Sequence, residues 1–365
     1  MQSGRISSRN IGSLISMMVV STTLLTGGLS TGQDGWISLL ISTVLFLPII
    51  LIYCRICSLF PGKDIYEIAD LVLGRALGSA VTLLLSVYAL NITALVIRNF
   101  TEFTTVISLD NTPIIVLILF IGSASLYLVK CGIQTLGRWS AIAFVVITIF
   151  SVTTVFLSYS SIDPRNLLPI MEADGRTLIN NALMLGSIAI GDNILMLTLV
   201  DNLRSKGKIY KAYLGGTLTG VFILLYMMLR NAMILGKSVV INAKFTSYLS
   251  VRLVNIGPFL ERIDALLAFT FIILGITKVA LALYATSKGA ARLMGIRNPH
   301  DVATPIFMLA AALCSTVCRN MMDMFSFMSV YPIIAVFFQL VIPVVILIAA
   351  EIRLHKNPML AETPN

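Results

Sequence analysis

The chain has 365 residues, of which 57% are apolar and only 12% are charged, and its mean hydropathy is +0.94. A water-soluble fold cannot bury so much apolar surface. A bilayer accepts it when the apolar stretches are helical, because helices satisfy their own backbone hydrogen bonds. The net charge of +9 does not indicate nucleic-acid binding, since the basic residues are scattered through the loops. We therefore predict an all-α integral membrane protein.

Ten apolar stretches are predicted to span the membrane. They are Ile11–Leu29, Trp36–Tyr53, Ala80–Ile97, Pro113–Val129, Arg138–Tyr159, Ile179–Val200, Tyr213–Leu235, Ile263–Thr286, Thr304–Val317 and Val330–Ala350. The first follows Arg5 and Arg9, as the apolar region of a signal peptide would, but it is long enough to span and further spans follow at once. A single membrane domain is expected over residues 1–365, with halves of about 1–160 and 161–365.

The charges of the predicted loops indicate the orientation. One side carries Arg5, Arg9, Arg55, Lys63, Arg75, Lys130, Arg138, Arg204, Lys206, Lys208, Lys211, Lys288, Arg292, Arg297, Arg353 and Lys356. The other side carries Arg98, Arg165, Arg176, Arg230, Lys237, Lys244, Arg252, Arg262 and Arg319. The side richer in lysine and arginine is expected to be cytoplasmic, which places both termini inside.

An even number of spans with both ends on one side is compatible with two five-helix halves. In inverted-repeat transporters the first helix of each half is broken near the bilayer centre. The first and sixth spans contain hydroxyl and glycine residues suited to a break: Ser21, Thr22, Thr23, Gly27 and Gly28, then Gly186 and Gly191. The two halves share no evident residue-level similarity, so the repeat is a hypothesis.

Asp192 is the most informative single residue. It lies inside the sixth span, between Gly191 and Asn193. An ionised acid there is costly unless it faces a cavity or a partner, so intramembrane acids are functional candidates by default. The alternative interpretation is that Asp192 lies close enough to the inner end of its span to be hydrated there.

Lys278 is the second intramembrane charge, and the alternative interpretation is that its long side chain snorkels to the interface. Asp192 and Lys278 each lie eight residues before the inner end of their predicted spans, at Val200 and Thr286. Both are therefore expected about 12 Å from that end at the helical rise. At matched depth, the two charges are predicted to pair with each other or to meet a ligand in one polar cavity.

Other polar residues carry weaker signals. Thr270, Thr277 and Tyr284 recur every seven residues on one face of the eighth span, which suits interhelical packing at least as well as ligand binding. Cys54 and Cys57 have the spacing of a redox or zinc pair but are interpreted as small apolar membrane residues. The sequence has no nucleophile elbow, phosphate loop, paired catalytic carboxylates or metal-ligand spacing. We therefore expect neither an enzyme nor a cofactor or metal.

Several short motifs occur in a fixed order along nearly the whole chain. They are DGWIS from Asp34, FPGKDIYEI from Phe60, GRALG from Gly74, RNFTEF from Arg98, NTP from Asn111, GIQTLGR from Gly132, NLLPIM from Asn166, the pair Gly191-Asp192, and FLERID from Phe259. Each is weak alone. Together they resemble the B-type subunit family of bacterial spore germinant receptors, within the amino acid–polyamine–organocation superfamily.

The resemblance implies ten helices in the LeuT-type inverted-repeat fold. It also implies nutrient sensing in the inner membrane of an endospore, with a larger A-type membrane subunit and a C-type lipoprotein as partners. Amino acids, and sometimes sugars or nucleosides, are the implied ligands. The implied pocket lies among the first, third, sixth and eighth helices.

This chain departs from the family pattern in its first helix. The family usually carries a Gly-x-Gly turn and a Leu-x-x-Pro-like break, whereas Ser21-Thr22-Thr23 and Gly27-Gly28 occur here without a proline. Either hydroxyls replace bare backbone as ligand contacts, or the helix is less broken and ligand affinity changes. Lys278 is also not an expected family feature.

These considerations define two sets of candidate residues. The ligand-binding candidates are Ser21, Thr22, Thr23, Gly186, Gly191, Asp192, Thr277 and Lys278. A structural network, as opposed to ligand contact, is expected for Arg98, Glu102, Arg138, Glu261, Arg262 and Asp264.

The favoured function is a receptor subunit that binds a small nutrient, most simply an amino acid, and triggers germination. The alternatives are a proton- or sodium-coupled secondary amino-acid transporter and a scaffold for the A-type subunit. A fold alone does not separate these functions.

Overall fold

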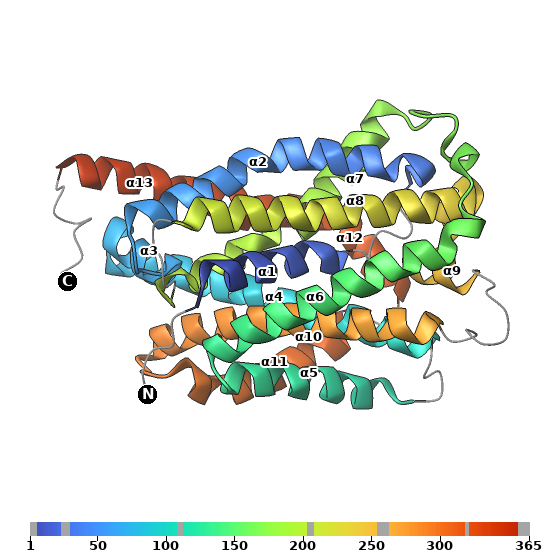
Figure 1. The fold of residues 1–365 in the computed structure, drawn as a ribbon. Coiled ribbons are helices and arrows are strands. Elements are labelled where there is room, and N and C mark those ends of the chain that lie inside the picture. Colours follow the sequence, from blue (N-terminus) through green and yellow to red (C-terminus); the bar gives the residue numbers. More distant parts are fainter. Residues whose placement is uncertain are drawn as a thin grey trace.

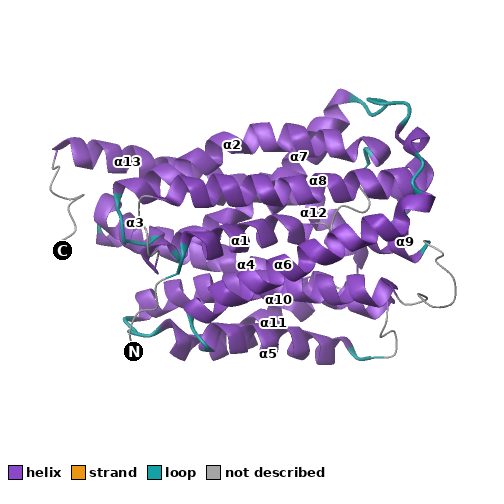
Figure 2. Cartoon of the chain, viewed as in Figure 1, coloured by secondary structure: helices purple, strands orange, loops and turns teal. Residues whose placement is uncertain are grey.

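The structure is a computed structural model that describes residues 6–22, 30–107, 112–202, 208–253, 263–317 and 321–356. Every regular element in these ranges is helical (Figure 2). The α-helices are α1 Ser8–Val20, α2 Gly35–Leu59, α3 Ile65–Leu73, α4 Arg75–Ile107, α5 Ile114–Lys130, α6 Ile133–Ser158, α7 Gly175–Ala189, α8 Ile209–Asn242, α9 Thr246–Arg252, α10 Ile263–Met294, α11 Pro299–Val317, α12 Met321–Val336 and α13 Ile342–Lys356. Two other elements matter for the site: the 3₁₀ helix η5, Gly191–Thr198, and the π-helix η9, Phe337–Val341.

The predicted spans correspond closely to these helices. Each of the ten overlaps a described helix, and within the described residues seven helices are long and apolar enough to cross a membrane. Two further apolar helices, Ile114–Lys130 and Pro299–Cys314, are shorter. The chain is therefore an all-α, multi-pass membrane protein, while the total of ten spans stays a prediction. The short helices α3 and α9 lie in segments that the sequence analysis left as loops.

The helices run side by side along one axis, so their ends gather at two faces of the bundle (Figure 1). The first residues of α1 and the last residues of α13 lie at the same face, whereas α9 and the segment between α6 and α7 lie at the opposite one (Figure 1). This arrangement agrees with the predicted grouping of the loops. Which face is cytoplasmic stays a prediction.

The first and sixth spans contain the residues suited to a break. In the first, α1 ends at Val20, and the hydroxyl of its C-cap residue Ser21 donates to the Met18 carbonyl at 2.6 Å. Thr23, Gly27 and Gly28 lie outside the described residues. In the sixth, α7 ends at Ala189 and the chain tightens into the 3₁₀ helix η5 at Gly191. The break predicted in the sixth span is therefore confirmed.

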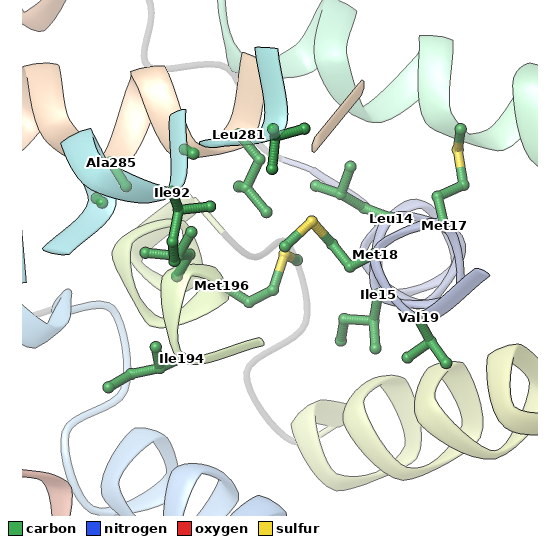
Figure 3. Close-up of a cluster of buried hydrophobic side chains, with 14 of the residues drawn as sticks. Leu14, Ile15, Met17, Met18, Val19, Ile92, Ile194, Met196, Leu281 and Ala285 are labelled. Carbon is green, nitrogen blue, oxygen red and sulfur yellow. The ribbon is translucent and has the colours of Figure 1, made fainter. Parts of the chain in front are cut away.

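The broken helix lies at the centre of the bundle. The most apolar 18-residue stretch of Gly175–Thr198 has 89% of its residues buried. The corresponding stretch of Ile133–Ser161, at the periphery, has 28% buried. Figure 3 shows the apolar contacts of this centre, where Met18 of α1 points toward Met196 of η5, with Ile92 of α4 nearby. The first and sixth spans therefore meet in the core, as a shared site between them requires.

Small residues allow α1 and α8 to pack closely. Gly216 and Gly220 form a GxxxG pattern on α8, which is a common packing motif of membrane helices. A side chain at Gly216 would meet the Gly12 carbonyl oxygen at 2.6 Å. The hydroxyl of Ser16 reaches across and donates to the Gly216 carbonyl at 2.8 Å. The glycines are thus required by backbone proximity, and the serine adds an interhelical hydrogen bond.

Candidate functional site

The end of α7 exposes backbone carbonyls in the middle of the protein. A helix leaves its last carbonyls without intrahelical partners, and in an apolar interior such groups need others. Gln339 donates to the Ser187 carbonyl at 2.8 Å, and Lys278 donates to the Ile188 carbonyl at 3.2 Å. The carboxamide of Asn193 donates to the Ala189 carbonyl at 3.3 Å. Side chains from η9, α10 and η5 therefore stabilise the break, and they bring polar groups to one point.

Asp192 lies directly after this break, in the first turn of η5. Its Oδ2 is 3.1 Å from the Lys278 ammonium, and the two side chains are only 4% and 5% exposed. The predicted pairing of the two intramembrane charges is confirmed, and the snorkelling interpretation of Lys278 is wrong. The charge of each residue is compensated by the other, because removing two ions from water without such compensation would cost several kcal/mol.

The other carboxylate oxygen of Asp192 accepts three hydrogen bonds from neutral groups. Tyr331 donates at 2.7 Å, Tyr88 at 3.0 Å and the carboxamide of Gln339 at 3.1 Å. The two tyrosine hydroxyls are 2.9 Å apart because both converge on the same oxygen. Donors from α4, α12 and η9 therefore fix the orientation of the carboxylate.

Gln339 occupies the π-helical turn between α12 and α13. π-Turns inside membrane helices redirect side chains and occur frequently at functional sites. Its carboxamide fills the space where a side chain on Gly191 would lie, so position 191 accommodates only glycine without displacement. Tyr53 of α2 donates to the Gln339 carbonyl at 2.6 Å and is 3.3 Å from the Gly191 carbonyl. The missing side chain at Gly191 thus makes room for Gln339 of η9, and Tyr53 lies against the backbone of both.

A cavity of about 60 Å³ opens beside the ion pair. One water needs roughly 10–15 Å³ on this measure, so the space suits a handful of waters or a molecule the size of a small amino acid. Its walls come from α4, α7, η5, α10 and α12: Ile92, Leu95, Val96, Asn99, Ile188, Asp192, Lys278, Phe327, Met328 and Tyr331. The cavity is thus mostly apolar, with a few polar groups from Asn99, Asp192, Lys278 and Tyr331 in its wall.

Two polar groups in this wall retain unused hydrogen-bonding capacity. An ammonium has three hydrogens, and within the described residues Lys278 uses two of them, on Asp192 and on the Ile188 carbonyl. The side-chain oxygen of Asn99 is buried and has no hydrogen-bond partner in the part of the chain that the structure describes. One donor and one acceptor thus remain available to a ligand in the cavity.

Comparison with known proteins decides the family. The family profile described as "Spore germination protein" matches residues 5–324. The chain belongs to the spore germination protein family. This finding confirms the resemblance to the B-type subunits of germinant receptors that the ordered motifs indicated.

Relatives of this germination protein in Bacillus subtilis (strain 168) match most of its length. Spore germination protein KB is 27% identical over 358 residues, which covers 96% of this chain and 95% of that protein. The putative spore germination protein YfkT is 26% identical over 317 residues, or 87% of each chain. Spore germination protein A2 is 26% identical over 292 residues, or 76% of this chain and 79% of its own.

Solved structures of transporters share the fold of this germination protein. Mhp1, a nucleobase-cation-symport-1 family transporter in a closed conformation with bromovinylhydantoin bound, gives a TM-score of 0.74 at 10% identity, covering 100% of this chain and 82% of that one. A Na⁺-coupled sialic acid symporter in a substrate-bound outward-open state gives 0.59 at 12% identity, covering 92% and 76%. At such identities the similarity establishes a LeuT-type transporter fold and nothing about ligands.

The cavity of the germination protein uses only part of the expected ligand-binding set. Asp192 and Lys278 line it, whereas the other described candidates lie elsewhere. Thr277 accepts a hydrogen bond from the Trp139 indole at 3.0 Å and so packs against α6. Gly186 packs against Phe46, and the buried hydroxyl of Thr22 has no partner among the described residues. Among the described residues, the cavity is lined by the third, sixth and eighth spans and by α12 at the start of the tenth, and none of its lining residues comes from α1.

The expected structural network is present only in part. Arg98 and Glu102 form a buried ion pair one turn apart on α4. Arg138, near the start of α6, is exposed and forms no ion pair with the described residues, so its place in the network stays a prediction. Glu261 and Arg262 lie outside the described residues, as does the side chain of Asp264.

The sequence analysis missed four residues of the site, namely Tyr88, Asn99, Tyr331 and Gln339. Gln339 carried a usable signal, because it is a lone amide within an apolar run and buried polar groups in membranes require partners. Asn99 was quoted only as part of the RNFTEF motif. The two tyrosines had no distinguishing pattern, since tyrosine also occurs at membrane interfaces and in cores.

Proposed function

We propose that this protein is the membrane subunit of a spore nutrient-germinant receptor and that it binds a small amino acid in the cavity beside Asp192 and Lys278. One observation carries the proposal. A buried ion pair adjoins a small apolar cavity, and the wall of that cavity retains one free donor at Lys278 and one free acceptor at Asn99. A zwitterion supplies the complementary pair of charges, whereas a sugar does not.

The charges of the site favour an amino acid over a neutral ligand. Its carboxylate would accept from Lys278, and its ammonium would donate to Asn99 and Asp192. Each protein charge would then keep an opposite charge within contact distance, so the ligand would enter without leaving a buried ion unpaired. The apolar wall from α4 and α12 would receive a small aliphatic side chain.

Receptor signalling requires that the ligand bind two states with different affinity. The break between α7 and η5 is the element best suited to respond, because its carbonyls are held by the same Lys278 and Gln339 that contact Asp192. We propose ten spans in two five-helix halves of about 1–160 and 161–365, with both termini cytoplasmic in the spore inner membrane. An A-type membrane subunit and a C-type lipoprotein are the proposed partners.

The test is ligand-induced thermal stabilisation of the purified protein in detergent, with a panel of amino acids, sugars and nucleosides. We expect a concentration-dependent rise in Tm for one or more small aliphatic amino acids, and its loss in Asn99→Leu and in Lys278→Met. Stabilisation by a sugar or nucleoside alone would contradict the amino-acid assignment. A stabilisation that both variants retain would move the site away from this cavity.

Secondary transport is the second candidate function, and the transporter fold favours it. A transporter must release its substrate on both sides of the membrane, whereas a receptor only needs to change state. Uptake of labelled amino acids into proteoliposomes separates the two. We expect binding without uptake above that of empty liposomes, and uptake dependent on Asp192 would support transport.

A further inference from the structure

Several described cations at the bundle face that holds the start of α1 are matched within the fold. The matched cations are Arg55 with Glu351, Lys288 with Asp64 and Asp201, Arg292 with Asp70, and Arg353 with the Leu71 carbonyl. Arg9, Lys208 and Lys211 form no ion pair with a described residue, and neither do Lys63, Arg75, Lys130 and Arg297, but the first three lie together. All three are exposed.

These three cations line a single groove of about 890 Å³ between α1, α8 and α6. That volume lies within the range of roughly 300–1,000 Å³ typical of ligand pockets. Beside the cations the lining is polar, with Ser7 and Ser8 at the start of α1, and the side-chain oxygen of Ser8 is buried with no partner among the residues described. Further along, the groove is lined by Gly215 and by Phe144 of α6.

The backbone adds positive potential at the same place. Both α1 and α8 begin at this end of the groove, and neither helix has an acid in its first turn. A helix N-terminus carries the equivalent of about half a positive charge. The positive charge of the groove therefore calls for an external anion.

We propose that this groove binds an anionic glycerophospholipid, with its phosphate between Arg9, Lys208 and Lys211 and an acyl chain along Gly215 and Phe144. Basic pockets between membrane helices on the cytoplasmic side are suited to anionic headgroups. The extent of the groove favours a whole lipid over a free phosphate, because the lining continues along α8 to Thr219. Leu218 and Phe222, beside it on α8, are 51% and 70% exposed, as expected of a lipid-facing surface.

The structure provides variants that separate the two parts of this site. Arg9→Gln, Lys208→Gln and Lys211→Gln together remove the headgroup contacts, and Lys130→Gln, at the exposed end of α5, is a control for the loss of a surface charge outside the groove. Gly215→Phe fills the acyl part, since a side chain there meets nothing within 4 Å. The full-length protein in dodecyl maltoside is titrated with phosphatidylglycerol, phosphatidylcholine or glycerol 3-phosphate. Bound lipid is counted by native mass spectrometry, and Tm is measured in parallel.

We expect retained phosphatidylglycerol and a raised Tm, with little effect of phosphatidylcholine or glycerol 3-phosphate. The triple variant should lose roughly a hundredfold in lipid affinity, from about 1 kcal/mol for each of the three cations, while Lys130→Gln keeps it. Gly215→Phe should weaken lipid binding without lowering the Tm of the lipid-free protein.

Equal binding of the two lipids, or full affinity in the triple variant, would refute the site. Glycerol 3-phosphate binding as tightly as the lipid, with no effect of Gly215→Phe, would show an anion site instead. Loss of A-type subunit binding in the triple variant, with unchanged lipid affinity, would assign the groove to a protein partner.

Discussion

The buried pair of Asp192 and Lys278 should behave as one energetic unit. Their charged atoms are 3.1 Å apart, which corresponds to a Coulomb attraction of about 5 kcal/mol at an effective dielectric constant of about 20. Removing one partner of a buried pair typically destabilises a protein by about 3–5 kcal/mol, because the remaining charge is left uncompensated. Each single variant is therefore expected to be strongly destabilised, and the double variant less so than the sum.

The hydrogen bonds of the site predict which single variant suffers more. In Lys278→Met the carboxylate keeps its donors from Tyr88, Tyr331 and Gln339. In Asp192→Asn the ammonium keeps a single carbonyl partner and faces the new amide. Asp192→Asn should therefore cost about 5 kcal/mol and Lys278→Met about 3 kcal/mol. A charge that has lost its partner can be neutralised by gaining or losing a proton. From the reference pKa values of lysine and aspartate this costs about 4–5 kcal/mol at pH 7, so the destabilisation of either single variant should not exceed that amount.

The assay is equilibrium unfolding in mixed micelles of dodecyl maltoside and increasing SDS, for the wild type, both single variants and the double variant. With single costs of about 3 and 5 kcal/mol, a double variant that loses no more than about 4 kcal/mol gives a coupling near 4 kcal/mol, above the usual range of about 0.5–3. The exposed pair Arg55 and Glu351, with side chains 50% and 47% exposed, is the matched control and should show a coupling below about 1 kcal/mol. Additive effects for Asp192 and Lys278 would refute the reasoning.

Three further predictions test other parts of the structure. Gly191→Ala should destabilise the protein by about 1–3 kcal/mol through overpacking against η9, whereas Gly215→Ala on the open groove should raise stability by up to about 1 kcal/mol in the same unfolding assay. Partial burial raises the pKa of Glu67, which penalises its ionised form in the folded state, so Glu67→Gln should raise Tm at pH 8 and the gain should disappear as the pH falls toward 4.5; a constant gain would contradict this. In a cysteine-free background, an impermeant maleimide added to intact cells should label Lys244→Cys but not Lys130→Cys, and the reverse pattern would invert the topology.

Several features followed from the sequence alone. Apolar runs of about 20 residues have only one stable backbone solution in lipid, so the helices and their order were predictable. The partnership of Asp192 and Lys278 was predictable for a similar reason, since equal depth follows from helical rise and a lone buried charge is too costly. Gly191, beside the acid, correctly indicated where the sixth span breaks.

Tertiary structure alone decided what surrounds that pair. Helices such as α2 and α12 are apolar on all sides, so their sequences do not specify which face turns inward. The convergence of Tyr88, Tyr331 and Gln339 on one oxygen depends on helix rotation and on the π-turn of η9. Because the sequence does not specify helix rotation, it also could not show that α12 lines the cavity and that α1 does not. The membrane constrains each helix along its axis, and only side-chain packing between helices fixes how each one is rotated.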